Sequence, residues 1–188
     1  MNNITKTLSH SRHDFPAITA AILNRYALAP DGVHGVSHWA QVLYNALTLT
    51  EITGADPEVV ALFALFHDSC RVNENCDRSH GARGAEFSRS LRGSLVHLDD
   101  LRYGLLWEAC CHHTEGGTDG DLTVQVCWDA DRLDLARVGV TPQPERLCTT
   151  ASHSLIPLAI ARSTGDCIPG EIGELLGLKY VAGQMKIC

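Results

Sequence analysis

The residues best suited to metal chemistry stand side by side at the end of an apolar run. Residues 59–66 are almost entirely apolar, and His67 and Asp68 follow directly. Asp56 before Pro57 is a typical helix start, with a capping carboxylate and a proline at the first helical position. Because the run has no polar face, we expect a central, buried helix. An ionised Asp68 at its end is costly unless it is paired or binds a cation. The alternative is that His67 and Asp68 only end the helix, where the dipole favours a histidine.

Other histidines and aspartates could join such a site. His38 is predicted near the start of a helix that Ser37 caps and that runs to about residue 53. A later helix is predicted over residues 122–138, with two apolar stripes along its surface. Asp131 falls inside one stripe and Asp129 inside the other, so periodicity does not choose between them.

Two charged neighbours of these aspartates are predicted to lie outside the core. Asp134 falls with Arg137 on a more polar face of the same helix, and we expect it to be solvated. Arg132 is expected to form a surface ion pair, with phosphate binding as the alternative.

The rest of the chain is also predicted to be helical. Periodicity and turn signals indicate further helices over residues 14–29, 79–93, 98–113, 155–161 and 171–178. Gly81 and Gly84 weaken the helix over 79–93, which suggests close packing or the approach of a ligand. The sequence shows no strand alternation, internal repeat or glycine-rich phosphate loop. The fold is therefore predicted to be all-α.

Composition narrows the class of protein. The 188 residues carry a formal net charge of −7 and are 45% apolar, which indicates one globular domain over residues 1–188. The absence of a basic block argues against duplex nucleic acid as a partner, whereas a small anionic substrate is allowed. No apolar run approaches the about 20 residues that span a bilayer, and the N-terminal stretch lacks the apolar core of a signal peptide. We therefore expect a cytoplasmic protein that does not engage membranes, with its eight cysteines reduced and mostly in the core.

The pattern of a first histidine, a His-Asp pair and a distant aspartate resembles the HD-domain superfamily of metal-dependent phosphohydrolases. The resemblance covers about residues 33–138 and implies a helical HD-type bundle, followed by a helical and loop extension over 139–188. It also implies that a divalent metal is held by His38, by the His67–Asp68 pair and by one of the two later aspartates. Imidazole and carboxylate ligands together suit Mn, Fe, Ni, Co or Zn.

The resemblance to HD proteins also suggests which aspartate is the last metal ligand and how many metal ions are bound. The run from Ala130 to Leu133, Ala-Asp-Arg-Leu, is similar to a segment of bacterial ppGpp hydrolases whose aspartate binds the metal, so Asp131 is preferred and Asp129 is kept in reserve. HD proteins with two metals place extra histidines between the His-Asp pair and the last aspartate. His80 and His113 fit that description, with His113 preferred to its neighbour His112. One ion is favoured and two are allowed.

The implied reaction is hydrolysis of a phosphate ester or anhydride of a small, nucleotide-like molecule by a metal-activated water. Asp68 would take part in catalysis, and Glu74 or Asp77 could accept a proton or orient the water, as acidic residues in this segment do in related nucleotidases. For both, a solvated loop carboxylate is the alternative. Arg71, and with it Arg83, could bind the phosphate.

Three other functions compete with this one. The same scaffold supports mixed-valent di-iron oxygenases, for which His80 and His113 would supply the additional ligands. The fold could also serve as a metal-stabilised binding module without catalysis. A cysteine nucleophile, Cys110 or Cys111 beside His112 or His113, is the weakest alternative, because adjacent helical residues point in different directions.

Overall fold

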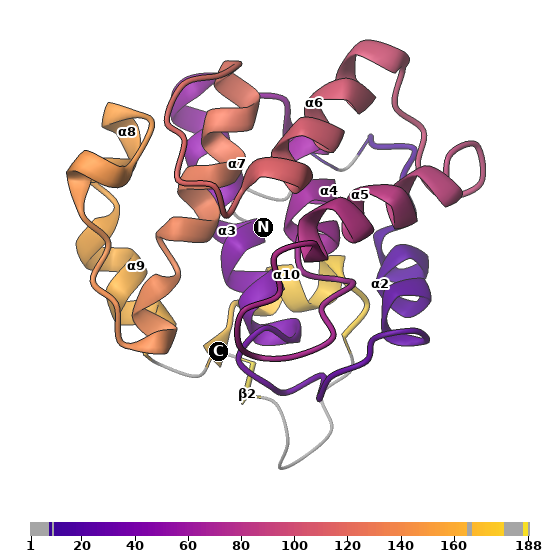
Figure 1. The fold of residues 1–188 in the computed structure, drawn as a ribbon, viewed down its shortest axis with the longest axis horizontal. Coiled ribbons are helices and arrows are strands. Elements are labelled where there is room, and N and C mark those ends of the chain that lie inside the picture. The colour runs from indigo at the N-terminus through magenta and orange to yellow at the C-terminus, as the bar shows by residue number, and fades with distance from the viewer. Residues whose placement is uncertain (1–7, 9, 165–166, 179–185, 188) are drawn as a thin grey trace.

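The structure is a computed structural model that describes residue 8 and residues 10–164, 167–178 and 186–187. These parts form a bundle of helices joined by loops, which confirms the predicted all-α fold (Figure 1). The helices around the candidate site are α3 (Val36–Thr53), α4 (Pro57–Phe66), α5 (His80–Ser90), α6 (Asp100–His112) and α7 (Leu122–Arg132). The remaining elements are α2 (Phe15–Leu23), the short 3-10 helices η1 (Leu135–Val138) and η2 (Pro144–Arg146), α8 (Thr150–His153), α9 (Ile156–Ser163), β1 (Cys167–Ile168), α10 (Gly170–Leu175) and β2 (Lys186–Ile187).

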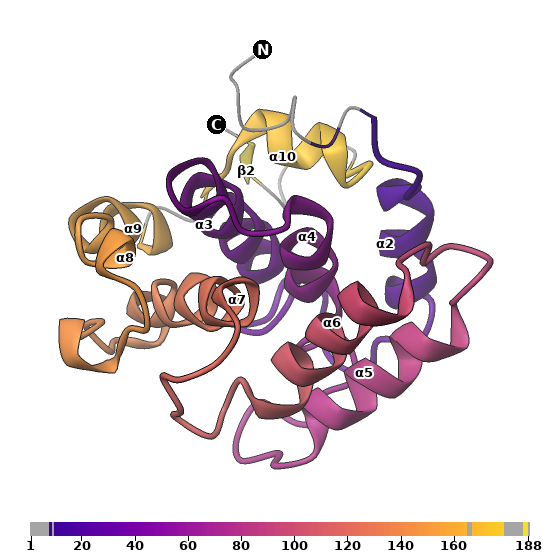
Figure 2. The ribbon, with the colours of Figure 1, turned by 90° about the horizontal axis from the view of Figure 1, so that it is seen from above.

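Helix α4 lies in the middle of the bundle, as its apolar sequence predicts. Every residue from Val59 to Phe66 is fully buried. Seen from above, α3, α6 and α7 surround α4, and all three pack against it (Figure 2). At its start, the Asp56 carboxylate accepts hydrogen bonds from the backbone N–H groups of Glu58 and Val59, both at 3.0 Å, which confirms the predicted cap. The residues that follow α4 are therefore delivered into the interior.

The predicted first helix is too long. Helix α2 ends at Leu23 rather than at residue 29. The chain turns there, so that the Tyr26 ring packs edge-on against Trp39, with 5.0 Å between the ring centroids. The Tyr26 hydroxyl donates a hydrogen bond to the carbonyl of His34 at 2.8 Å. These contacts hold the loop before α3 against the bundle.

Helix α3 begins two residues earlier than predicted, and its N-cap is Gly35 rather than Ser37. The reason is a tight turn, in which the backbone N–H of Val36 donates to the carbonyl of Pro30 at 2.8 Å. A Cβ atom on Gly35 would lie 2.1 Å from that carbonyl oxygen, so the turn requires glycine. The turn sets the position of the first turn of α3.

Close packing of α5 confirms what its glycines suggest. A Cβ atom on Gly81 would lie 2.1 Å from the carbonyl oxygen of Cys110 in α6. A Cβ atom on Gly84 would lie 2.1 Å from the carbonyl oxygen of Phe66 in α4. The first turns of α5 therefore touch the backbones of two other helices, and His80 enters the core with them.

The single helix predicted over residues 122–138 is wrong, because α7 ends at Arg132 and the shorter 3-10 helix η1 follows. Gly139 ends η1 with a φ of 76°, a conformation that favours glycine. The change of helix type alters the direction of every side chain after Arg132. This break decides where Asp134 points.

The C-terminal part contains the two further helices that the sequence predicts, α9 and α10, with α8 before them. Helix α9 packs against η1 and α3. The strands β1 and β2 pair in parallel over two residues each. None of the helices described combines the length and the apolarity that crossing a membrane requires.

Candidate metal centre

Two histidines from neighbouring helices meet in the interior. His38 lies in the first turn of α3 and His67 directly follows α4. Neither side chain has exposed surface. Their Nε2 atoms are 3.0 Å apart. The packing of α3 against α4 thus forms one imidazole pair.

The Asp68 carboxylate lies between this pair and a second one. Its Oδ2 atom is 3.6 Å from His38 Nε2 and 3.8 Å from His67 Nε2. Its Oδ1 atom is 2.9 Å from His80 Nε2 and 3.8 Å from His113 Nε2. Each carboxylate oxygen therefore faces a different pair of histidines.

The second pair comes from the start of α5 and the end of α6. His80 Nε2 and His113 Nε2 are 2.8 Å apart, and both residues are buried. The neighbouring His112 has a side chain that is 50% exposed and pairs with Glu115 at 2.9 Å. The preference for His113 over His112 agrees with these positions.

The two aspartates of α7 lie in different surroundings. Asp131 Oδ1 is 3.3 Å from His38 Nε2 and 3.8 Å from His67 Nε2. The Asp129 carboxylate instead accepts hydrogen bonds from the backbone N–H groups of Cys148 and Thr149 and from the Thr149 hydroxyl. Asp131 therefore joins the histidine cluster, whereas Asp129 anchors the segment after η2.

The four histidines share an arrangement at their other ring nitrogen. Each Nδ1 faces an oxygen that accepts a hydrogen bond. These oxygens are Asp134 Oδ2 at 2.7 Å for His38, the carbonyls of Phe63 and Ala64 at 3.1 Å each for His67, the carbonyl of Asp77 for His80, and the carbonyl of Cys110 at 2.8 Å for His113. Each Nδ1 therefore carries a proton, and in a neutral ring Nε2 presents a lone pair.

The Nε2 lone pairs inside the cluster require a positive charge near them. Lone pairs that face each other across 3.0 and 2.8 Å repel unless a positive charge lies near both. Histidines that bind metals are held in the same way, with the other ring nitrogen bonded to a carbonyl or carboxylate. Possible ligand atoms lie within 4.8 Å of one another in two groups, one formed by His38, His67 and Asp68 and one by Asp68, His80 and His113. The residues present therefore fit divalent metal ions.

The pKa values of the first group suit metal binding. Burial lowers the pKa of His67 to about 3, although Asp68 and Asp131 raise it, so the imidazole is neutral at pH 7. Burial alone would raise the pKa of Asp68 and of Asp131, but the nearby imidazoles bring both below the ordinary value. Both carboxylates are therefore ionised, and neutral imidazole with ionised carboxylate is what a metal requires.

Two histidines show how strongly the cluster attracts positive charge. Burial lowers the pKa of His38, but hydrogen bonds with Asp131 and Asp134 outweigh it and the net pKa is raised. Burial likewise lowers the pKa of His113, and the hydrogen bond with Asp68 reverses the sign. The carboxylates thus favour a cation beside these rings, whether a proton or a metal ion.

Arg71, predicted to bind phosphate, lies at the second histidine pair. Its Nη1 atom is 3.4 Å from Asp68 Oδ1 and 3.3 Å from His80 Nε2. Its Nη2 donates to the carbonyl of Asn75 at 2.7 Å, and the residue is only 7% exposed. Arg71 therefore balances the Asp68 charge and holds the loop before α5.

Glu74, one of the two candidate bases, lies at the edge of the cluster. Its carboxylate bonds to Nδ1 of His34, and its side chain is 36% exposed. The His34 ring stands perpendicular to the His38 ring, with 6.3 Å between the centroids. The pair of His34 and Glu74 therefore lies next to the cluster and reaches solvent.

The carboxylate of Asp77, the other candidate base, forms hydrogen bonds within the loop before α5. Its carboxylate accepts hydrogen bonds from the backbone N–H of Val72 at 2.9 Å and from Arg83 Nη2 at 2.5 Å. Arg83 also donates to the carbonyl of Cys70 through Nε and Nη2. Asp77 touches the cluster through its carbonyl, which orients His80, and Arg83 is likewise engaged in closing the loop.

The expectation that Asp134 is solvated is wrong. The residue is 1% exposed, and its carboxylate bonds to Nδ1 of His38 at 2.7 Å and to the hydroxyl of Ser163 at 2.5 Å. Asp134 lies just after the end of α7, where His38 of α3 and Ser163 of α9 enclose its carboxylate. The spacing from Asp131 is a signal that could have found it, because residues three apart in a helix share a face.

The expected surface ion pair of Arg132 is also wrong. Arg132 is 8% exposed and donates to the carbonyls of Gly117 and Arg146 at 2.7 and 2.9 Å. The guanidinium therefore ties two loops together next to Asp131 instead of facing solvent. An arginine beside an aspartate in an otherwise apolar stripe gives no sequence signal for this role.

The cysteine alternative receives no support from the structure. Burial raises the pKa of Cys110 well above its ordinary value, and burial also raises the pKa of Cys111. Both thiols are therefore disfavoured as nucleophiles. His113 faces the carbonyl of Cys110 rather than its sulfur. Cys110 and Cys111 are both free thiols.

Comparison with known proteins agrees with this geometry. The family model described as HD domain matches residues 35–136, more than half of the chain. The matched segment contains both histidine pairs, Asp68 and Asp131. Neither the search of curated proteins nor the search of solved structures gives a match.

Proposed function

The chain belongs to the HD-domain family, and from that premise we propose that it is a metal-dependent hydrolase of phosphate esters or anhydrides of a small, nucleotide-like molecule. The family consists mostly of metal-dependent phosphohydrolases. The observation that carries the proposal is the convergence of four Nε2 atoms on the buried Asp68 carboxylate, two of them also beside Asp131, with every Nδ1 already bonded to an oxygen. Such a set of donors has no use for its lone pairs other than to bind a cation.

The residues that would hold metal form two sets that share Asp68. His38, His67 and Asp131 face Asp68 Oδ2, and the second histidine pair faces Asp68 Oδ1. This division supports a second ion beside the one that the sequence favours. A divalent ion, when bound, lowers the pKa of a coordinated water and polarises a phosphoryl oxygen.

The chain's own residues prepare the site in three ways. Asp134 and the carbonyls of α4, α6 and the loop before α5 keep the ring protons on Nδ1. Arg71 offsets the charge of Asp68 from the protein side. Glu74 holds the proton on Nδ1 of His34, which leaves His34 Nε2 free to exchange a proton with a substrate group. We therefore assign proton transfer to Glu74 and His34, and a positioning role to Asp77.

Turnover and metal content, measured together, test the proposal. The protein is loaded with Mn, Fe, Ni, Co or Zn and assayed for phosphate release from a panel of nucleotides and simple phosphate esters. His67→Ala should lose both metal and phosphate release, whereas His112→Ala, at an exposed histidine, should keep both. A wild type that binds metal and is stabilised by it, yet releases phosphate from no compound, would instead indicate a metal-stabilised binding module.

A di-iron oxygenase is the second candidate, and the second histidine pair is the observation that favours it. His80 and His113 complete a second set of ligands around the shared Asp68, as two iron ions require. Two irons per chain, an EPR signal of a mixed-valent pair and oxygen consumption with a substrate would identify this activity. Phosphate release by protein loaded only with redox-inert Zn would remove it.

A further inference from the structure

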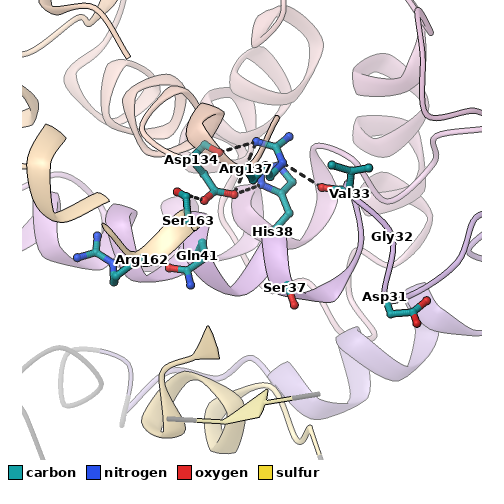
Figure 3. Close-up of a pocket in the computed structure, with 10 residues that line it drawn as sticks. All are labelled: Asp31, Gly32, Val33, Ser37, His38, Gln41, Asp134, Arg137, Arg162 and Ser163. Atoms are coloured by element: carbon teal, nitrogen blue, oxygen red, sulfur yellow. Dashed lines mark hydrogen bonds and ion pairs between the residues drawn. The ribbon is translucent and has the colours of Figure 1, made fainter. Parts of the chain in front are cut away.

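A pocket of about 260 Å³ lies beside His38, on the side of the ring that faces Asp134 (Figure 3). The loop before α3, the first turns of α3, η1 and the end of α9 enclose it. It borders the histidine cluster only through the His38 ring, whose Nε2 faces the cluster and whose Nδ1 faces Asp134. The pocket is thus a separate space next to the metal centre.

Arg162 brings a positive charge to this pocket without a direct ion pair in the described parts of the chain. Its Nη2 donates to the neutral Asn45 side chain, and its guanidinium lies 4.4 Å from the centre of the Tyr44 ring. Its Nε is buried and has no hydrogen-bond partner. Within the described parts of the chain, no carboxylate lies within ion-pair distance of Arg162. Burial lowers the pKa of this guanidinium, although Tyr44 and Asp134 raise it, as is typical of a cation without an ionised partner.

Arg137 is a second positively charged residue that lines the pocket, and only some of its N–H groups have hydrogen-bond partners among the described residues. Its Nε donates to the carbonyl of Val33 at 2.9 Å and its Nη1 to the carbonyl of Asp134 at 3.1 Å (Figure 3). In the region described, no group accepts a hydrogen bond from its Nη2. The Asp134 carboxylate bonds to His38 and Ser163 and also pairs with Arg137 Nη1 at 3.6 Å, so Nη2 is the part of Arg137 that remains for a ligand.

The charged residues of the pocket and its volume indicate which class of ligand it would bind. Asp31 also lines the pocket, but it is exposed, and solvent screens its charge more than that of the half-buried Arg162. A volume of about 260 Å³ exceeds the about 30 Å³ of one water several times. It lies just below the range of about 300–1,000 Å³ that is usual for small-molecule sites. The space suits a small organic molecule rather than a bare ion.

We propose that this pocket binds a small organic oxyanion, whose phosphate or carboxylate group is held by Arg162. Guanidinium groups bind both kinds of anion through charge-assisted hydrogen bonds, and Arg137, which also lines the pocket, adds positive charge. The hydroxyl of Ser37 at the start of α3 lines the same space and adds a neutral donor. The proposal does not depend on turnover at the metal centre.

Anion binding by Arg162 variants tests the proposal. Orthophosphate and, separately, acetate are titrated into the metal-loaded protein at constant ionic strength, and affinity is measured by calorimetry and by the shift of the thermal midpoint. Arg162→Gln should weaken binding of the preferred anion by about tenfold or more, since it removes charge-assisted hydrogen bonds. Arg146→Gln, the same change at an exposed arginine outside the pocket, should leave the affinity unchanged. Tighter binding of orthophosphate would identify a phosphate ligand, and tighter binding of acetate a carboxylate.

A variant of the metal centre locates the bound anion. Asp131→Asn should retain anion binding, because Asp131 does not line the pocket. Loss of binding in Asp131→Asn with retention in Arg162→Gln would place the anion on the metal and overturn the proposal, as would the absence of binding of both probes to the wild type. If Arg162→Gln does not fold, the Arg162→Lys variant tests the proposal instead, because lysine keeps the charge but lacks the planar set of guanidinium donors. Unchanged affinity in folded Arg162→Lys would contradict the proposal.

Discussion

His38 depends on Asp134, a residue that is not itself a candidate ligand. Asp134 holds its Nδ1 proton, and Ser163 and Arg137 in turn hold the Asp134 carboxylate. A carboxylate in this position makes the imidazole a better ligand and fixes the direction of its ring. At the scale of single residues, the centre is thus built by hydrogen bonds around the ligands as well as by the ligands.

The two aspartates of α7 give a prediction at the same scale. Asp131→Asn should lower metal affinity at least tenfold, because the carboxylate beside His38 and His67 loses its charge. Asp129→Asn should keep the metal but lower the free energy of unfolding by about 2 kcal/mol, because the hydrogen bonds from residues 148–149 lose a charged acceptor. Metal content after dialysis and urea unfolding measure the two effects. The reverse pattern, with metal lost only in Asp129→Asn, would show that the roles are exchanged.

At the scale of secondary-structure elements, α5 packs closely against α6 only because Gly81 has no side chain. A Cβ atom on Gly81 would collide with the carbonyl of Cys110 in α6. Gly81→Ala should therefore lower the free energy of unfolding by about 1–3 kcal/mol, the usual effect of overpacking. It should also weaken metal binding, since His80 precedes Gly81 directly.

Gly104→Ala is the matched control for this substitution. Gly104 lies in α6, and nothing is within 4 Å of the position that its Cβ would take. The control should be neutral or stabilising by up to about 1 kcal/mol, because alanine favours the helix. Thermal or urea unfolding compares the two variants. Equal stability would mean that α5 does not need its close approach to α6.

The cap of α4 gives a prediction about pH. Burial raises the pKa of Asp56, but hydrogen bonds from Arg102 and from the Val59 backbone outweigh it, so the pKa is lower than usual. A carboxylate with a lowered folded-state pKa stabilises the fold above about pH 4, and this contribution is lost as the pH falls through the folded-state pKa. Asp56→Asn keeps a capping side chain and loses the charge. It should be less stable by about 1 kcal/mol at pH 7, and the difference should shrink between about pH 5 and pH 3.

Asp14→Asn serves as the control at the cap of α2. Its carboxylate accepts a hydrogen bond from Ala17 and is exposed, with no arginine partner in the part of the chain described. Urea unfolding at several pH values should show little difference between this variant and the wild type. A pH-independent difference for Asp56→Asn would mean that the pairing with Arg102 does not stabilise α4.

At the scale of the whole molecule, the candidate ligands join five helices. His38 belongs to α3, His67 and Asp68 follow α4, and the remaining ligands come from α5, α6 and α7. Bound metal would therefore act on the cooperative unfolding of the bundle. With free metal at about 100 times its dissociation constant, stabilisation amounts to about 2.7 kcal/mol.

Removal of metal should consequently lower the thermal midpoint by about 5–10 °C, given about 2–4 °C per kcal/mol for a chain of this size. Calorimetry with and without a chelator measures the shift. His67→Ala should show no response to the chelator, because its site is already impaired. If neither the chelator nor added metal changes the thermal midpoint of the wild type, the protein does not contain a bound metal ion.

The sequence by itself determined the features that depend on residues close together in the chain. The apolar run of α4 predicts burial, its Asp-Pro start predicts the cap, and the adjacent His67 and Asp68 predict a polar site at its end, all of which the structure contains. Adjacent residues stay adjacent in any fold, and a helix without a polar face has to lie inside. The family assignment rests on the order of residues along the chain, from His38 through the His67–Asp68 pair to the later aspartate.

Only the tertiary structure decided which of several equivalent residues enter the site. Asp131 rather than Asp129 and His113 rather than His112 reach the cluster, because neighbouring side chains leave a helix in directions about 100° apart and packing selects one of them. Asp134 is buried because His38 of α3 and Ser163 of α9 pack against its carboxylate, contacts that the local sequence does not contain. The direction of a side chain near the end of a helix depends on the partner against which that end packs, and no local pattern contains that partner.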